Sequence, residues 1–182
     1  MARDTLFRSL HDIGLAAWFG GTLANAVALN AAAGAPRKGR DRGAVANTGW
    51  DRWTPVNAVA IGAHLIGGAG VLTTSKHRLT AQHGAATMTI TKLALTGAAL
   101  GATGYARLLG RRVAAQTDVA VSDGTTAAKS TPPEVAAAQR QLAVFQWAIP
   151  ALTGAMLVVN PYAEQQRANE AATDLAARII SH

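Results

Sequence analysis

Three ionisable side chains fall inside stretches of the chain that are otherwise apolar: His11, His64 and Lys92. An ionisable group costs free energy in a bilayer, so each one is by default a candidate for function. Each also has a structural interpretation. In that interpretation His11 only caps a helix, His64 only donates a hydrogen bond to a backbone carbonyl, and Lys92 only extends back to the membrane interface.

A second set of histidines gathers at one predicted membrane face. His11 opens the first apolar stretch, and His77 and His83 flank the connection between the second and third. Neutral imidazole binds both copper and zinc, so His11, His77 and His83 form a candidate metal site. The same residues also fit a solvated basic loop with no ligand.

Haem ligation by His11 together with His64 conflicts with the expected depths. His64 precedes the end of the second apolar stretch by roughly eleven residues, or about 16 Å along a helix. His11 lies at the start of the first apolar stretch, which begins at the membrane face where the second stretch ends. The two imidazoles then lie at different depths, unless the first helix begins nearer Leu6.

Several kinds of chemistry are excluded by composition. The chain has no cysteine, which rules out disulfides, thiolate zinc sites and Cys-ligated iron–sulfur clusters. It contains no phosphate-binding glycine loop, no HExxH and no GxSxG motif. No acidic pair lies within an apolar stretch, which disfavours ion-driven transport. We predict no catalytic residue.

The elements that carry these side chains are long and apolar. A bilayer core of about 30 Å requires about 20 mostly apolar residues as helix, and four stretches meet that length. The sequence therefore predicts an all-α integral membrane protein, a single domain over 1–182. We expect four transmembrane helices, near 10–32, 55–75, 86–108 and 141–160. An alanine-rich soluble bundle is the alternative. The first apolar run could also be read as a signal peptide, but it exceeds the usual length of a signal-peptide core.

The charges concentrate in the connections. The formal net charge is +7, which suits a protein seated against anionic lipid headgroups. The basic loop 33–54 and the flexible loop 109–140 carry more Lys and Arg than the opposite side. The positive-inside rule then places both termini outside the cytoplasm of a bacterial plasma membrane. The tail 161–182 could form an amphipathic helix, with Ala163, Ala171, Leu175 and Ile179 on one face.

Small residues predict where helices approach one another, since lipid supplies no hydrophobic drive between helices. Gly97-x-x-x-Gly101 has this form in the third helix. Glycines of the first two helices have the same predicted role (Gly20, Gly21, Gly67, Gly68, Gly70). Asn25 and Asn57 are expected to hydrogen-bond between helices, and Trp50 and Trp53 to anchor the second helix at the interface.

The motif LH-x-x-G-x-x-x-W-x-GG, from Leu10 to Gly21, resembles the first helix of a group of small bacterial membrane proteins. The group includes the copper-resistance CopD-like proteins and the HemJ-like protoporphyrinogen oxidases. The pair Lys92-Leu93 before an apolar helix is similar as well. The resemblance implies a helical bundle linked to haem b or copper, with His11 and Lys92 as cofactor-binding residues and His64 as a further candidate.

Two functions are compatible with these observations. The first is a non-catalytic accessory protein, or a subunit of a membrane complex, acting through helix packing or self-association. The second is a haem- or copper-binding redox-type protein that uses His11, His64 and Lys92. A nucleic-acid partner is disfavoured, because the basic cluster PRKGRDR is short and lacks stacking aromatics.

Overall fold

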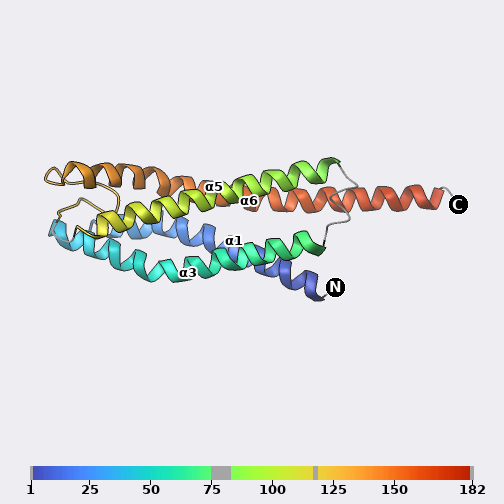
Figure 1. Cartoon of the computed structure of the whole chain (residues 1–182), viewed down its shortest axis with the longest axis horizontal. Coiled ribbons are helices and arrows are strands. Elements are labelled where there is room, and N and C mark those ends of the chain that lie inside the picture. Colours follow the sequence, from blue (N-terminus) through green and yellow to red (C-terminus); the bar gives the residue numbers. More distant parts are fainter. Residues whose placement is uncertain (1, 75–82, 117–118, 181–182) are drawn as a thin grey trace.

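The computed structural model describes residues 2–74, 83–116 and 119–180. Within these ranges the chain is helical apart from its connections and one isolated antiparallel bridge, Val121 with Ala127. The elements are α1 (Ala2–Ala24), a π-helical segment η1 (Asn25–Leu29), α2 (Asn30–Ala32), α3 (Gly39–Thr74), α5 (His83–Ala114) and α6 (Pro133–Ile180). The long helices run side by side along one axis (Figure 1).

Three helical segments are long and apolar enough to cross a membrane: Arg3–Ala32, Gly39–Thr73 and Pro133–Tyr162. Because the described residues form helices and no named strand, the all-α prediction is confirmed. The apolar helices are compatible with a membrane protein. The predicted segment 86–108 lies in α5, a helix of 32 residues that is not among these three candidate membrane-spanning segments.

The connections are shorter than the sequence predicts. The expected basic loop 33–54 becomes helical from Gly39 onward, and the expected flexible loop 109–140 is helical at both ends. Charged residues extend the helices of this bundle past their apolar segments. In α1, for example, Arg8 and Asp4 form an ion pair on successive turns. A charge-free stretch locates the apolar part of a helix but not its ends.

Two helical hairpins make up the bundle. α1 packs along α3, α5 packs along α6, and α1 against α6 joins the two pairs. Within the described ranges, α3 and α5 meet at only a few positions. The buried core is one cluster, made of Leu15, Trp18, Ala60, Ala99 and Met156.

Glycines mediate the close approach between α1 and α3. The glycines of α5, for which the sequence predicts the same role, do not. A Cβ atom at Gly21, Gly67 or Gly70 would overlap a residue of the facing helix. A Cβ at Gly97 or Gly101 would meet no atom of its own chain within 4 Å, apart from its immediate helical neighbours. The predicted glycine contacts on α5 are therefore wrong within this chain.

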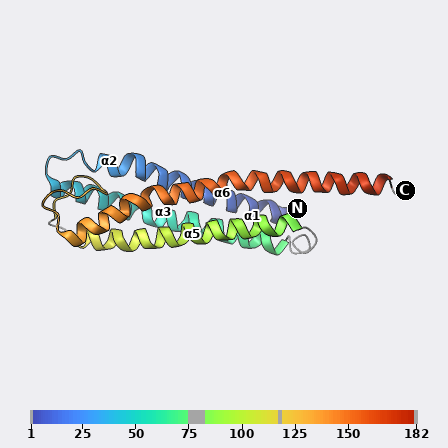
Figure 2. The same ribbon diagram turned by 90° about the horizontal axis from the view of Figure 1, so that it is seen from above.

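α6 continues beyond the other helices as a single extension (Figures 1 and 2). It passes through both Pro150 and Pro161, so the tail is part of α6 rather than a separate surface helix. Ile179 on this extension is 69% exposed. The side chains of Ala163, Ala171 and Leu175 lie outside the described part, so the amphipathic face stays a prediction.

Candidate functional site

His11 and His64 face each other across α1 and α3. Their ring centroids are 4.1 Å apart, and the rings are stacked with an angle of 19° between the planes. The expected difference in depth is therefore wrong. α1 begins at Ala2 rather than near residue 10, so His11 and His64 lie at equivalent heights of two antiparallel helices. We call His11 and His64 the histidine pair.

Each member of the pair hydrogen-bonds to the backbone of the other. His11 Nδ1 lies 3.0 Å from the carbonyl oxygen of His64, and His64 Nδ1 lies 3.1 Å from the carbonyl oxygen of His11. A carbonyl oxygen only accepts, so both Nδ1 atoms carry the proton and donate. In a neutral imidazole the Nε2 atom then keeps its lone pair, as in histidines that ligate metals through Nε2.

Two glycines allow this close approach. A Cβ at Gly14 would overlap the backbone of Ala60 and His64, and a Cβ at Gly67 would overlap the backbone of Phe7 and His11. Each histidine is followed after three positions by the glycine that admits the other one. The repeat His-x-Ile-Gly occurs at 11–14 and again at 64–67, and this signal in the sequence could have identified the pair.

His64 is the buried member of the pair, and His11 is half-buried. His64 is 2% exposed and the Trp18 side chain is fully buried. The indole of Trp18 meets the His64 ring edge-on, with centroids 6.2 Å apart. Packing on several sides fixes the orientation of His64, which favours a preorganised site over a mobile one.

All three predicted cofactor residues line one cavity. The histidine cavity has a volume of about 340 Å³ and lies between α1, α3, α5 and α6. His11, His64 and Lys92 lie in its wall, together with the sulfur-bearing Met156. Leucines and a valine supply much of the remaining lining (Leu65, Val71, Leu72, Leu93, Leu157). The structure thus assembles from three helices the residues that the sequence singled out.

The predicted metal site at His11, His77 and His83 is only partly described. His77 lies outside the described residues, and His83 begins α5 with a side chain that is not described. Among the residues that the structure does describe, no three His, Cys, Asp or Glu side chains form a metal-binding group. This metal site stays a prediction.

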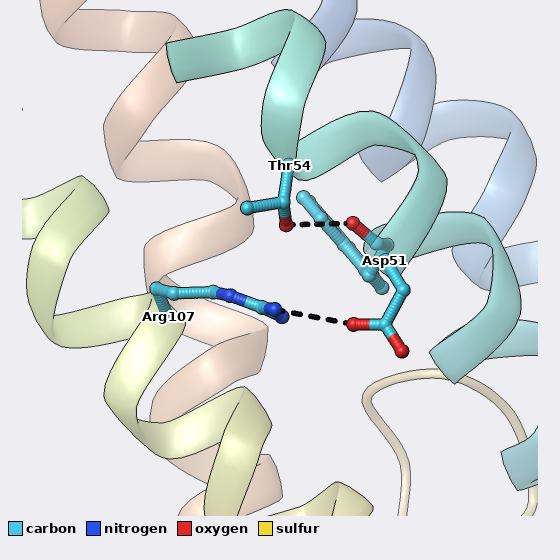
Figure 3. Close-up of polar contacts among 4 residues, drawn as sticks. Asp51, Thr54 and Arg107 are labelled. Atoms are coloured by element: carbon cyan, nitrogen blue, oxygen red, sulfur yellow. Dashed lines mark hydrogen bonds and ion pairs between the residues drawn. The ribbon is translucent and has the colours of Figure 1, made fainter.

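A second polar cluster occupies the other half of the bundle. Arg107 extends from α5 toward Asp51 on α3 and pairs with it at 3.1 Å (Figure 3). On the α3 side, Trp50 Nε1 donates to Asn30 Oδ1, and Asn30 Nδ2 donates to Gln146 Oε1. Trp50 and Trp53 both line a cavity of about 370 Å³ here, which we call the α3–α5 cavity, and their role as interface anchors stays a prediction.

No protein-family model, curated protein or solved structure matches the chain. The resemblance to CopD-like and HemJ-like proteins therefore rests on the motif alone. The geometry of the histidine cavity is the basis on which a function can be assigned.

Proposed function

We propose that the chain is a multi-pass membrane protein of the redox type, which binds copper or haem b in the histidine cavity. In this proposal α5 completes a four-helix bundle in a bacterial plasma membrane, with both termini outside the cytoplasm. The observation that carries it is the histidine pair, whose Nδ1 atoms are engaged by carbonyls while the Nε2 atoms keep their lone pairs. Lys92 lines the same cavity.

Copper fits this arrangement better than haem held between the two imidazoles. Axial ligation by both histidines needs the rings on opposite faces of the porphyrin, whereas these rings stack directly on each other. Copper(I) accepts imidazole and thioether ligands, and Met156 lines the cavity with the pair. Haem would be held by one imidazole of the pair, and it would supply redox chemistry there.

The test is an absorption spectrum with metal analysis of the protein purified in mild detergent. We expect either copper at about one ion per chain, because one histidine pair lines the cavity, or a haem Soret band. His64→Ala should abolish the signal. A colourless chain that also fails to take up copper(I) and hemin added in vitro would contradict the proposal.

Three further variants distinguish copper from haem and one predicted site from the other. Met156→Leu conserves volume and removes the sulfur, so it should weaken copper binding and leave haem binding intact. His77→Ala and His83→Ala serve as controls at the other predicted metal site. Loss of copper in these two controls, with retention in His64→Ala, would move the site to the predicted His11, His77 and His83 group.

The second candidate is the accessory subunit, and two observations favour it. Gly97 and Gly101 present an open face of α5, where a facing helix from another chain could approach closely. The α6 extension projects past the bundle (Figure 2). Cross-linking in membranes, followed by mass spectrometry, tests this candidate: we expect cross-links from the α6 extension to a second chain. An extension that forms only intrachain cross-links would contradict it.

A further inference from the structure

The histidine cavity ends at the buried core. Among the described residues, its lining on α1 ends at Asp12, and Leu15, about one turn farther along the helix, is fully buried. The lining on α5 ends at Thr96, and Ala99, again about one turn farther, is fully buried. Leu15 and Ala99 both belong to the core cluster, so packed side chains close the cavity toward the middle of the bundle.

From the core, the cavity extends toward the end of the bundle at which α1 begins. We call this end the proximal end; α3 ends there, α5 begins there, and α6 extends beyond it (Figure 1). On α3 the lining residues run from His64 to Leu72, and on α6 they run from Met156 to Pro161, in both cases toward the proximal end. The cavity is therefore a blind pocket, with the histidine pair near its closed end.

Polar and charged side chains line the part of the cavity nearer the proximal end. Arg8 on α1, Lys92 on α5 and Asn160 on α6 all lie there, and all three are half-buried. Arg8 also pairs with Asp4 at 3.0 Å. Ionisable side chains in membrane segments face water-filled cavities or pair with one another, so this part of the wall is suited to water.

The side of the cavity between α3 and α5 is apolar instead. Leu65 on α3 is 41% exposed, Leu93 on α5 is 56% exposed, and both line the cavity. In a bilayer these side chains meet lipid chains, which do not solvate an ion. A copper ion therefore has a polar route from the proximal end and an apolar barrier at the side.

We propose that copper(I) enters and leaves the histidine cavity from water on one side of the membrane only, the side of the proximal end. The inference rests on the proposed function, since it concerns how the same site is loaded. Half-buried His11 lies next to exposed Asp12 in the cavity wall, so the polar wall leads directly to the histidine pair. Because the core closes the other end, the chain binds copper without passing it through the membrane.

Cysteine labelling tests this access without any copper. The chain has no cysteine, so each introduced one is a single reporter. Thr96→Cys lies at the closed end of the histidine cavity, and Gly104→Cys lies on the same helix beyond Ala99, in the wall of the α3–α5 cavity. Ile179→Cys, on the exposed α6 extension, shows which membrane vesicles, right-side-out or inverted, present the proximal end to the outside.

A membrane-impermeant maleimide is added to both kinds of vesicle. We expect Thr96→Cys to react about tenfold or more faster in the vesicles that label Ile179→Cys, because the reactive thiolate forms only where water reaches it. Asn160→Cys, nearer the proximal end, is a second reporter with the same expected pattern, and Gly104→Cys should not react in those vesicles. Equal reaction of Thr96→Cys and Asn160→Cys in both kinds, or in neither, would overturn the proposal. Reaction of Gly104→Cys as fast as Thr96→Cys from the proximal side would also overturn it.

Copper removal separates this inference from the proposed function. Bathocuproine disulfonate, a membrane-impermeant chelator of copper(I), is added to copper-loaded vesicles of each kind, with His64→Ala vesicles as the background. We expect it to remove copper only where Ile179→Cys reacts. Removal only from the other kind would overturn the inference and leave the copper site standing. Absence of bound copper in both kinds, with Thr96→Cys still labelled from the proximal side, would instead overturn the copper site and leave the access standing.

Discussion

The two faces of α3 differ in how closely they approach a neighbouring helix. On the α1 side, glycines bring backbones into contact, and the histidine pair hydrogen-bonds from one helix to the other. On the α5 side, the helices hardly touch among the described residues, and the long side chain of Arg107 bridges the distance to Asp51. The same helix therefore has one closely packed face and one open face.

The difference arises from where glycine and polar residues fall on α3. Gly67 and Gly70 face α1 and allow contact with His11 and Phe7. Trp53, Asn57 and Ile61 line the α3–α5 cavity instead, and no glycine of α3 lies among its lining residues. Glycine lets two helix backbones approach closely, and Gly67 and Gly70 do so on the α1 face.

The largest expected effect comes from closing the space on the packed face. Gly14→Ala adds a Cβ that would overlap the backbone of Ala60 and His64, so the two helices must separate. We expect a loss of about 3 kcal/mol in the free energy of unfolding, typical of an overpacked core. Chemical denaturation in detergent, followed by circular dichroism, measures it.

Gly20→Ala is the control for this prediction. Gly20 lies on the same helix, and a Cβ there meets no neighbouring atom within 4 Å. Alanine forms helix better than glycine, so we expect a gain of about 0.5 kcal/mol. Similar losses in Gly14→Ala and Gly20→Ala would show that α1 and α3 are not in backbone contact.

An intermediate effect is expected from the histidine pair. Each single change to alanine, His11→Ala or His64→Ala, removes a hydrogen bond and the ring stack, so the second change has less left to remove. A double-mutant cycle should give a coupling of about 1 kcal/mol between the two sites. Additive losses in the double variant would mean that the two rings do not interact in the folded protein.

The smallest effect is expected at the open face. The side chains of Arg107 and Asp51 are 40% and 66% exposed, so water screens their attraction. Asp51→Asn should change the free energy of unfolding by less than about 1 kcal/mol in the same denaturation assay. A loss as large as that of Gly14→Ala would show that this ion pair holds α3 in place as strongly as the glycine contact does.

The sequence predicts the helices better than the contacts between them. Uncharged stretches locate the apolar segments, because burying a charge in a bilayer is costly. They do not locate the helix ends, since charged residues such as Arg8 continue a helix into water. The ends decide which residues face each other across antiparallel helices, so a start at Ala2 rather than near residue 10 is enough to pair His11 with His64.

Part of the histidine cavity could nevertheless be predicted. His11, His64 and Lys92 stand out as ionisable groups in apolar segments, and all three line it. Met156 could not be singled out, since an apolar side chain within an apolar helix carries no distinguishing signal. The α3–α5 cavity could not be predicted either, because it depends on the separation of two helices and not on any residue pattern within one of them.

The protonation of the histidine pair tests the central claim most directly. Nitrogen-detected magnetic resonance of ¹⁵N-histidine-labelled protein in detergent identifies which ring nitrogen carries the proton, and His11→Ala and His64→Ala assign the signals. We expect both rings to be protonated on Nδ1 with a free Nε2, and the Nε2 signals to move when copper(I) is added. Proton on Nε2 in both rings, with no change on addition of copper(I), would contradict a metal site built on this pair.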